Sequence, residues 1–262
     1  MFCVLNIEKR KRTILENLFR FISRDEYSIK TVPVFKGAPF YVLDAKICNN
    51  IDWCKIIEIA GKCSKKLLIS GNIEIPEDKN LGKFNSGVLY NKIFQNTVLQ
   101  ILKNNVNLKS PQNISVYDKK GEYQDFVTML LPYASTLKVV TENKQKYFSL
   151  CDDVLESTGI CISLLSKFDD SKIKIDTERN IMSVAVENGF LNVSEGENIK
   201  VEETYKKLLP QGINAYDFYS ALYELCGVFS LGSCIFETVC VNYEKKHIDT
   251  VTFSWHNGKF LI

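Results

Sequence analysis

The sequence lacks a long apolar run, since no window approaches the roughly 18 consecutive apolar residues of a membrane-spanning helix. It also lacks a secretory signal. In the N-terminal stretch MFCVLNIEKRKR the apolar residues precede the basic ones, which is the reverse of the order in a signal peptide, and no small-residue cleavage site follows. These absences predict a cytoplasmic protein that does not contact a membrane.

The chain has no strong excess of either charge. Its formal net charge is +2, which predicts no nucleic-acid partner. The distribution is uneven, because Met1 to Lys36 carries a balance of +4 and Glu187 to Glu203 a balance of −4. These two stretches are either solvated surfaces or the two sides of a subunit contact, so a homodimer is one expectation.

Paired cysteines are missing as well. No C-x-x-C occurs, and the cysteines are scattered among apolar neighbours; the nine are Cys3, Cys48, Cys54, Cys63, Cys151, Cys161, Cys226, Cys234 and Cys240. A reduced thiol in such a setting behaves as a small hydrophobic side chain. The pattern therefore predicts structural thiols in a reducing compartment.

The common catalytic and metal-binding motifs are absent. There is no G-x-S-x-G, no P-loop and no H-E-x-x-H, so catalytic residues stay unassigned. Only His247 and His256 could supply imidazole, and Cys226, Cys234 and Cys240 lack the spacing of structural zinc sites. We expect no metal. Cys234, in the turn-like LGSC, is the one thiol in a setting that a nucleophile could use.

What the sequence does contain is a recurring order of strand and helix. Its middle has short apolar runs at 114–118, 137–142 and 160–165, separated by amphipathic stretches, and Gly159 is placed to end the second of these helices. This alternation predicts right-handed crossovers. We therefore expect a Rossmann-like α/β fold, with a mostly parallel sheet covered by helices on both faces.

Different patterns flank this centre. The N-terminal part reads as a further α/β segment, in which Pro33 and Pro39 favour edge positions for the strands beside them. After Lys167 we expect a helix that opens at Asn214, followed by an antiparallel β-meander with an Asn-Gly turn. The predicted segments are 1–105, 106–170 and 171–262, and the third could join the sheet of the second.

The turn DKKGEY after the first central strand stands where a dinucleotide-binding protein has its glycine fingerprint. Here Asp118 takes the place of the first glycine and Lys120 that of the second, and only Gly121 remains. A standard pyrophosphate grip is not expected. Glu142, which lies 24 residues after Asp118, is about where an acidic residue would hold a ribose hydroxyl.

The carboxyl ends of parallel strands still gather ligands, and basic residues follow three strands, at Lys9 to Arg12, at Lys119 and Lys120, and in Asn143 to Lys146. We predict that a small anionic or nucleotide-like ligand binds there; a nucleotide is the cofactor class considered. The ligand-binding residues are Asp118, Lys119, Lys120, Gly121, Thr141, Glu142, Asn143 and Lys144. The lysines at 119 and 120 would meet the anion and Glu142 a hydroxyl, and Thr141 or Asn143 would cap the next helix. The alternative is a non-catalytic assembly or regulatory protein that keeps the fold without a ligand.

The order of elements from about Phe2 to Leu165 resembles that of two-domain Rossmann proteins of the shikimate dehydrogenase type. The resemblance implies an α/β segment followed by a nucleotide-binding segment. It does not extend to the glycine fingerprint, so no residue role is taken from it.

Overall fold

The computed structural model describes residues 1–262 except 10–24, 49, 71–72, 77–78, 80, 86, 106–111, 169, 185–190, 230, 233, 253, 257–258 and 262. The chain divides into two compact units. Unit 1 consists of Met1–Tyr90 and Val201–Gly232, and unit 2 of Asn91–Lys200 and Ser233–Ile262. These units cut across the segments 1–105, 106–170 and 171–262, because residues 201–232 pack with the N-terminal strands.

Unit 1 is built on a four-stranded sheet with the order β2-β3-β1-β4. Its strands are β1 (Cys3–Lys9), β2 (Glu26–Val32), β3 (Phe40–Ile47) and β4 (Leu67–Ile69). β1 runs parallel to β3 and β4, and β2 pairs antiparallel with β3. β2 is thus at an edge, as predicted. β3 is internal, contrary to the prediction; Pro39 is compatible with this position because it lies just before the first residue of β3 and removes no ladder hydrogen bond.

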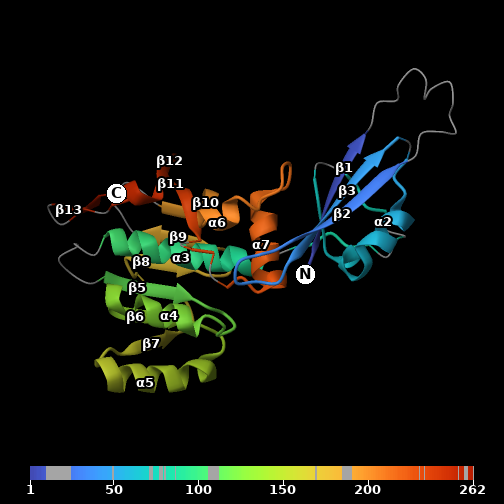
Figure 1. Ribbon diagram of the computed structural model, residues 1–262. Helices are drawn as coiled ribbons and strands as arrows, with labels where there is room; N and C mark the ends of the chain where they lie inside the picture. Colours follow the sequence, from blue (N-terminus) through green and yellow to red (C-terminus); the bar gives the residue numbers. More distant parts are fainter. Residues whose placement is uncertain are drawn as a thin grey trace, which may run out of the picture. The chain divides into compact units, whose positions relative to one another are not determined.

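Helices pack on this sheet, and the hydrophobic core of the unit lies between them and the strands. On one face, α2 (Trp53–Ala60) and η1 (Gly61–Lys65) bury Ile56 and Cys63 against Leu5 and neighbouring strand residues. α2 begins at Asp52, whose carboxylate accepts the Lys55 amide at 3.0 Å. Figure 1 shows α2 beside β1 and β3.

Unit 1 is completed by α6 (Glu203–Lys206) and α7 (Ala215–Cys226). α7 begins at Asn214, whose side chain accepts the Asp217 amide at 3.1 Å, as its sequence predicted. The ring of Phe218 meets Phe2 edge-on at 6.0 Å and Phe40 at 5.4 Å. These buried rings join α7 to the strands of unit 1.

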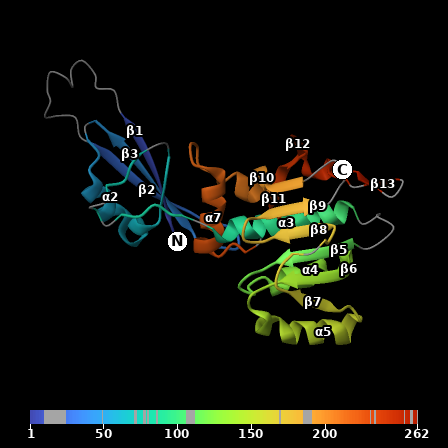
Figure 2. The same cartoon turned by 180° about the vertical axis from the view of Figure 1, so that it is seen from behind.

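Unit 2 contains a five-stranded sheet with the order β7-β6-β5-β8-β9. Its strands are β5 (Gln112–Tyr117), β6 (Ala134–Val140), β7 (Ile162–Leu165), β8 (Ile173–Asp176) and β9 (Ile181–Val184). The first four are parallel, and β9 pairs antiparallel with β8. The crossovers contain α4 (Gln124–Leu130), η2 (Leu131–Tyr133), η3 (Lys144–Tyr147) and α5 (Phe148–Thr158). In both overall views α4 lies along β5 and β6, and α5 beside β7 (Figures 1 and 2).

An antiparallel sheet of order β10-β11-β12 follows in the same unit. Its strands are β10 (Leu191–Lys200), β11 (Ile235–Val241) and β12 (Glu244–His247); η4 (Ile248–Thr250), β13 (Ser254–His256) and β14 (Lys259–Leu261) come after them. α3 (Val88–Asn104) packs on β11, where the Thr97 hydroxyl accepts the Phe236 amide at 3.0 Å. The predicted Asn-Gly turn falls on residues 257–258, outside the described residues.

The predicted fold class is confirmed: the chain is α/β, with Rossmann-like parallel strands flanked by helices and a C-terminal antiparallel sheet. The segment after Lys167 joins the central sheet through β8, which pairs with β5. In the part of the chain that the structure describes, no helix is long and apolar enough to cross a membrane.

All nine cysteines lie in described ranges, and all are free. Burial raises the pKa of the Cys3 thiol from its ordinary value of 9.0 to about 12, with a smaller contribution from nearby Cys63. Burial likewise raises the pKa of Cys234 from 9.0 to about 12. Both thiols are therefore protonated in the folded protein at neutral pH.

These two thiols predict a loss of stability in alkali. Below pH 9 they are protonated in both the folded and the unfolded chain, and their full contribution is present. Above it the unfolded chain alone loses the protons, so the free energy of unfolding should fall by about 1.4 kcal/mol per pH unit for each thiol. Urea unfolding of the wild type and of Cys3→Ala from pH 8 to pH 11 tests this, because the variant should show a shallower decline. Equal slopes would contradict it.

Candidate functional site

The carboxyl ends of β5, β6 and β8 meet at one edge of the unit 2 sheet. The Asp118 amide, just after β5, donates to the Val140 carbonyl at the end of β6 at 3.0 Å. On the other side of β5, the Thr177 amide and hydroxyl both donate to the Tyr117 carbonyl, at 3.2 and 2.6 Å. The strand ends near residues 118 and 142 therefore lie side by side, as the sequence predicted.

All eight predicted ligand-binding residues lie in the two turns at this edge, which follow β5 and β6. The turns pack directly on each other. The Glu142 amide donates to the Lys119 carbonyl at 3.2 Å. Gly121 has a φ of +68°, and a Cβ there would lie 3.0 Å from the Lys146 side chain, so this position favours glycine both by conformation and by space.

Asp118 shows what an aspartate does in place of the fingerprint glycine. Its side chain is buried, and its carboxylate accepts four hydrogen bonds. Oδ1 accepts the amides of Gly121 at 2.9 Å and Glu122 at 3.0 Å. Oδ2 accepts the Tyr123 amide at 2.8 Å and the Tyr147 hydroxyl at 2.6 Å. Burial, followed by this bond to Asp118, raises the pKa of Tyr147 well above its ordinary value, so the phenol stays a donor.

The amides of Gly121, Glu122 and Tyr123, in the turn that precedes α4, thus have an internal anion as their acceptor. In a dinucleotide-binding fold such amides and the helix dipole face a phosphate. Here the carboxylate of Asp118 takes that place. These amides are not open to a ligand, because Asp118 already supplies their acceptor. A buried donor without an acceptor would cost about 1 to 3 kcal/mol.

Four of the other six predicted residues are engaged with one another. Lys119 Nζ lies 3.4 Å from Glu142 Oε1, and this carboxylate is the main cause of the raised pKa of Lys119. The Thr141 hydroxyl accepts the Asn143 amide at 3.1 Å within the turn, but the predicted helix cap is not formed, because η3 and α5 both begin without a side-chain cap. Lys120 and Lys144 are exposed. Their predicted roles toward a ligand remain predictions.

Beside this turn the structure contains a cavity that the sequence did not reveal. It has a volume of about 260 Å³ and is lined by Tyr117, Phe168, Asp176, Glu178 and Arg179. β5 leads to β6 and β7 on one side, whereas β8 lies on its other side. The cavity is therefore at the topological switch point, where open parallel sheets bind their ligands.

The walls of this cavity combine aromatic and charged groups. The rings of Tyr117 and Phe168 have centroids 5.8 Å apart and are tilted by 39°. Asp176 shapes the turn after β8, since its Oδ1 accepts the amides of Glu178 and Arg179, both at 3.0 Å. Arg179 Nε lies 3.8 Å from Asp176 Oδ2. The site thus offers a ring surface beside carboxylate acceptors.

The cavity could not be predicted from the sequence, because its lining residues come together only when β8 pairs with β5. Tyr117 is the last residue of a strand that was predicted, but its position at a switch point depends on β8 lying beside β5. The alternating run KIKID at 172–176 indicated a further strand, and a further strand would have to pair with one of the others in the sheet. Phe168 stands in the connection between β7 and β8, where no periodicity marks it.

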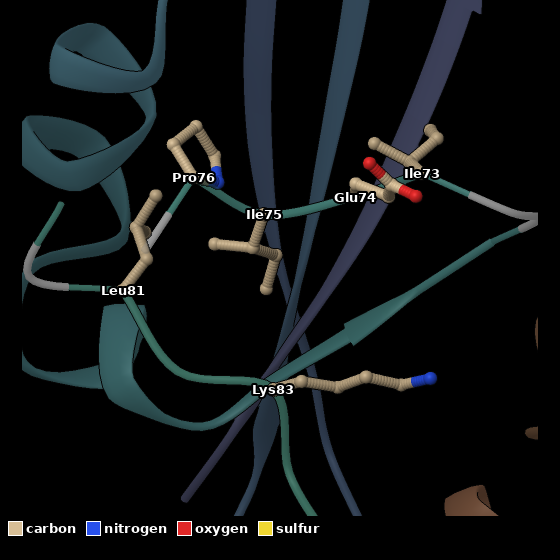
Figure 3. A pocket seen from close by; sticks show the side chains of 6 residues that line it. All are labelled: Ile73, Glu74, Ile75, Pro76, Leu81 and Lys83. Carbon is tan, nitrogen blue, oxygen red and sulfur yellow. The ribbon is translucent and has the colours of Figure 1, made fainter. Parts of the chain in front are cut away.

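A second cavity lies in unit 1, in the connection between β4 and α3. It is open, has a volume of about 880 Å³ and is lined by Ile73, Glu74, Ile75, Pro76, Leu81 and Lys83 (Figure 3). Its lining is mostly aliphatic, with one acid and one lysine. Among the described lining residues, Glu74 and Lys83 are the ionisable ones.

Metal and nucleophilic sites receive no support. Among the described residues, no group of three or more His, Cys, Asp and Glu side chains is placed to hold a metal ion. Cys234 is 4% exposed, and its pKa of about 12 keeps it a thiol at neutral pH. A buried thiol in this state is a poor nucleophile, which argues against the one candidate that the sequence offered.

Comparison with known proteins adds little. No protein-family model matches the chain, and no curated protein matches it. Among solved structures, L-tryptophan dehydrogenase from Nostoc punctiforme is similar at 10% sequence identity, over 67% of this chain and 56% of that chain, with a TM-score of 0.27. The match spans little more than half of that protein, and a likeness at this level carries no argument about function.

The network around Asp118 predicts a stability effect. Asp118→Ala removes the acceptor of two buried and two partly buried donors and should lower the free energy of unfolding by roughly 3 kcal/mol or more. Tyr147→Phe removes one bond to a charged group and should cost about 1.5 to 3 kcal/mol. Urea denaturation measures both.

Glu156→Ala is the matched control, because Glu156 is an exposed acid on α5 in the same unit. It should change the free energy of unfolding by less than about 0.5 kcal/mol. If Asp118→Ala costs no more than this control, the carboxylate does not hold the two turns together.

Proposed function

We propose that this chain binds a small, planar, nucleotide-like ligand in the cavity at the switch point of its Rossmann-like sheet. The observation that carries the proposal is the position of that cavity between the carboxyl ends of β5 and β8, where Tyr117 and Phe168 face it together with charged side chains. Open α/β sheets place their ligands at this point because the two crossovers leave it in opposite directions.

The lining suits a ring of modest size. A volume of about 260 Å³ is just below the range of about 300 to 1,000 Å³ that drug-sized ligands occupy. The paired rings of Tyr117 and Phe168 would stack on a planar group, an interaction worth about 1 to 3 kcal/mol for a nucleic-acid base. Asp176 and Glu178 would accept hydrogen bonds from the ligand.

The residues predicted from the sequence have a supporting part in this proposal. Lys119 lies two residues after Tyr117 of the cavity lining, in the turn that follows β5, and its ammonium group pairs with Glu142. The pair Lys119 and Glu142 would then contact the polar end of a ligand whose ring enters the cavity. Asp118 would act indirectly, by fixing the turn after β5.

Ligand binding should be visible as thermal stabilisation. A panel of nucleobases, nucleosides and nucleotides at millimolar concentration is mixed with the protein, and the Tm is recorded. A ligand at 100 times its Kd adds about 2.7 kcal/mol to the free energy of unfolding, which raises the Tm by several degrees. The absence of any shift across the panel would contradict the proposal.

A pair of phenylalanine variants then locates the site. Phe168→Ala removes one stacking face and should weaken the Kd by tenfold or more. Phe148→Ala is the matched control, because Phe148 lies on α5 of the same unit and is 55% exposed. Its Kd should equal that of the wild type. Equal affinity of both variants would place the ligand elsewhere.

A second candidate function is assembly without a ligand, and one observation favours it. In unit 1 the side chains of Phe35 and Phe229 are 57% and 79% exposed. The segments that carry them are joined, since the Ala38 amide donates to the Cys226 carbonyl at 2.8 Å. Exposed aromatic side chains of this kind are typical of contact surfaces.

This candidate predicts a homodimer that depends on Phe229. Light scattering over a concentration series should give a dimeric mass for the wild type and a lower apparent mass for Phe229→Ala, with Phe148→Ala unchanged. A salt series separates the two kinds of contact, because a contact between the oppositely charged stretches 1–36 and 187–203 weakens with salt and an apolar one does not. A monomeric wild type at all concentrations would exclude the candidate.

A further inference from the structure

The charges around the switch-point cavity restrict what can bind in it. Of its lining residues, Asp176 and Glu178 are acidic and Arg179 is basic, which leaves a net charge of −1. The arginine is already beside a carboxylate, with its Nε 3.8 Å from Asp176 Oδ2. A phosphate or carboxylate on a ligand would therefore meet repulsion from Glu178, an exposed acid at the cavity.

Lys119, the lysine two residues after Tyr117 of the cavity lining, is also engaged. Lys119 lies 3.4 Å from Glu142, so its charge is largely balanced before a ligand arrives. The amides of Gly121, Glu122 and Tyr123, in the turn before α4, already donate to Asp118. A phosphate in this turn would find these donors occupied and would meet the charge of that carboxylate.

From these observations we infer that the site takes a planar heteroaromatic ligand that carries hydrogen-bond donors and no phosphate, of the nucleobase or nucleoside class. The inference rests on the proposed function and makes it specific. The rings of Tyr117 and Phe168 bind the heterocycle, and the carboxylates of Asp176 and Glu178 accept from its amino or hydroxyl groups. A nucleotide is discriminated against by its phosphate.

The test compares matched ligands. Adenosine, guanosine, cytidine and uridine are titrated into the full chain by isothermal titration calorimetry at low salt, each beside its 5′-monophosphate. We expect at least one nucleoside to bind about tenfold tighter than its monophosphate, a difference of about 1.4 kcal/mol. The difference should shrink at high salt, because like-charge repulsion is screened.

One variant and one control assign the discrimination to the cavity. Glu178→Gln keeps the shape of the side chain and removes its charge, so it should bring the Kd values of nucleoside and monophosphate within about threefold of each other. Glu156→Gln, which removes an exposed acid from α5, should leave the tenfold difference intact. A Glu178→Gln protein that discriminates as the wild type does would overturn the assignment.

The outcomes separate this inference from the proposed function. If a monophosphate binds as tightly as its nucleoside or more tightly, and Phe168→Ala weakens it, the cavity binds ligands but the inference is wrong. If no nucleoside and no monophosphate binds, the inference is wrong, and the proposed function then depends on the rest of the thermal panel.

Discussion

The structure of the central sheet edge depends on one buried carboxylate. Asp118 accepts three backbone amides from the turn after β5 and the Tyr147 hydroxyl from the segment before α5. A buried charge is tolerated only when it is hydrogen-bonded in this way, and buried amides likewise need an acceptor. The carboxylate and the amides satisfy each other's hydrogen-bonding needs. The consequence is a turn that is fixed in place and packed against the turn after β6.

Because Asp118 occupies the amides of the turn after β5, the candidate site lies beside that turn, between the ends of β5 and β8. The position that holds a phosphate in dinucleotide-binding folds is filled from within, while the neighbouring switch point keeps a cavity with two aromatic rings and two carboxylates. In our proposal the fold therefore retains the location of a ligand site and changes its chemistry. Where fold and site disagree in this manner, function has to be argued from the site.

Local signals in the sequence were sufficient for much of the fold. Asn214 caps α7, and Gly159, with a φ of +72°, ends α5, because both effects involve only residues within a few positions. Features that depend on residues far apart in the sequence could not be predicted in this way. Pro39 suggested an edge strand, although β3 is internal. The sequence shows directly that Asp118 replaces a fingerprint glycine. It does not show that Asp118 bonds to Tyr147, which lies 29 residues away. The cavity could not be predicted either, because it forms only where β8 lies beside β5.

The most direct test of this account is a two-dimensional NMR titration of the isotope-labelled chain with a nucleoside and, separately, with inorganic phosphate. The account predicts that the nucleoside shifts the amide signals of Tyr117, Phe168 and the turn from Asp176 to Arg179, and that phosphate leaves those of Gly121, Glu122 and Tyr123 in place. Phosphate-dependent shifts at these three amides, with no response at the switch point, would contradict it.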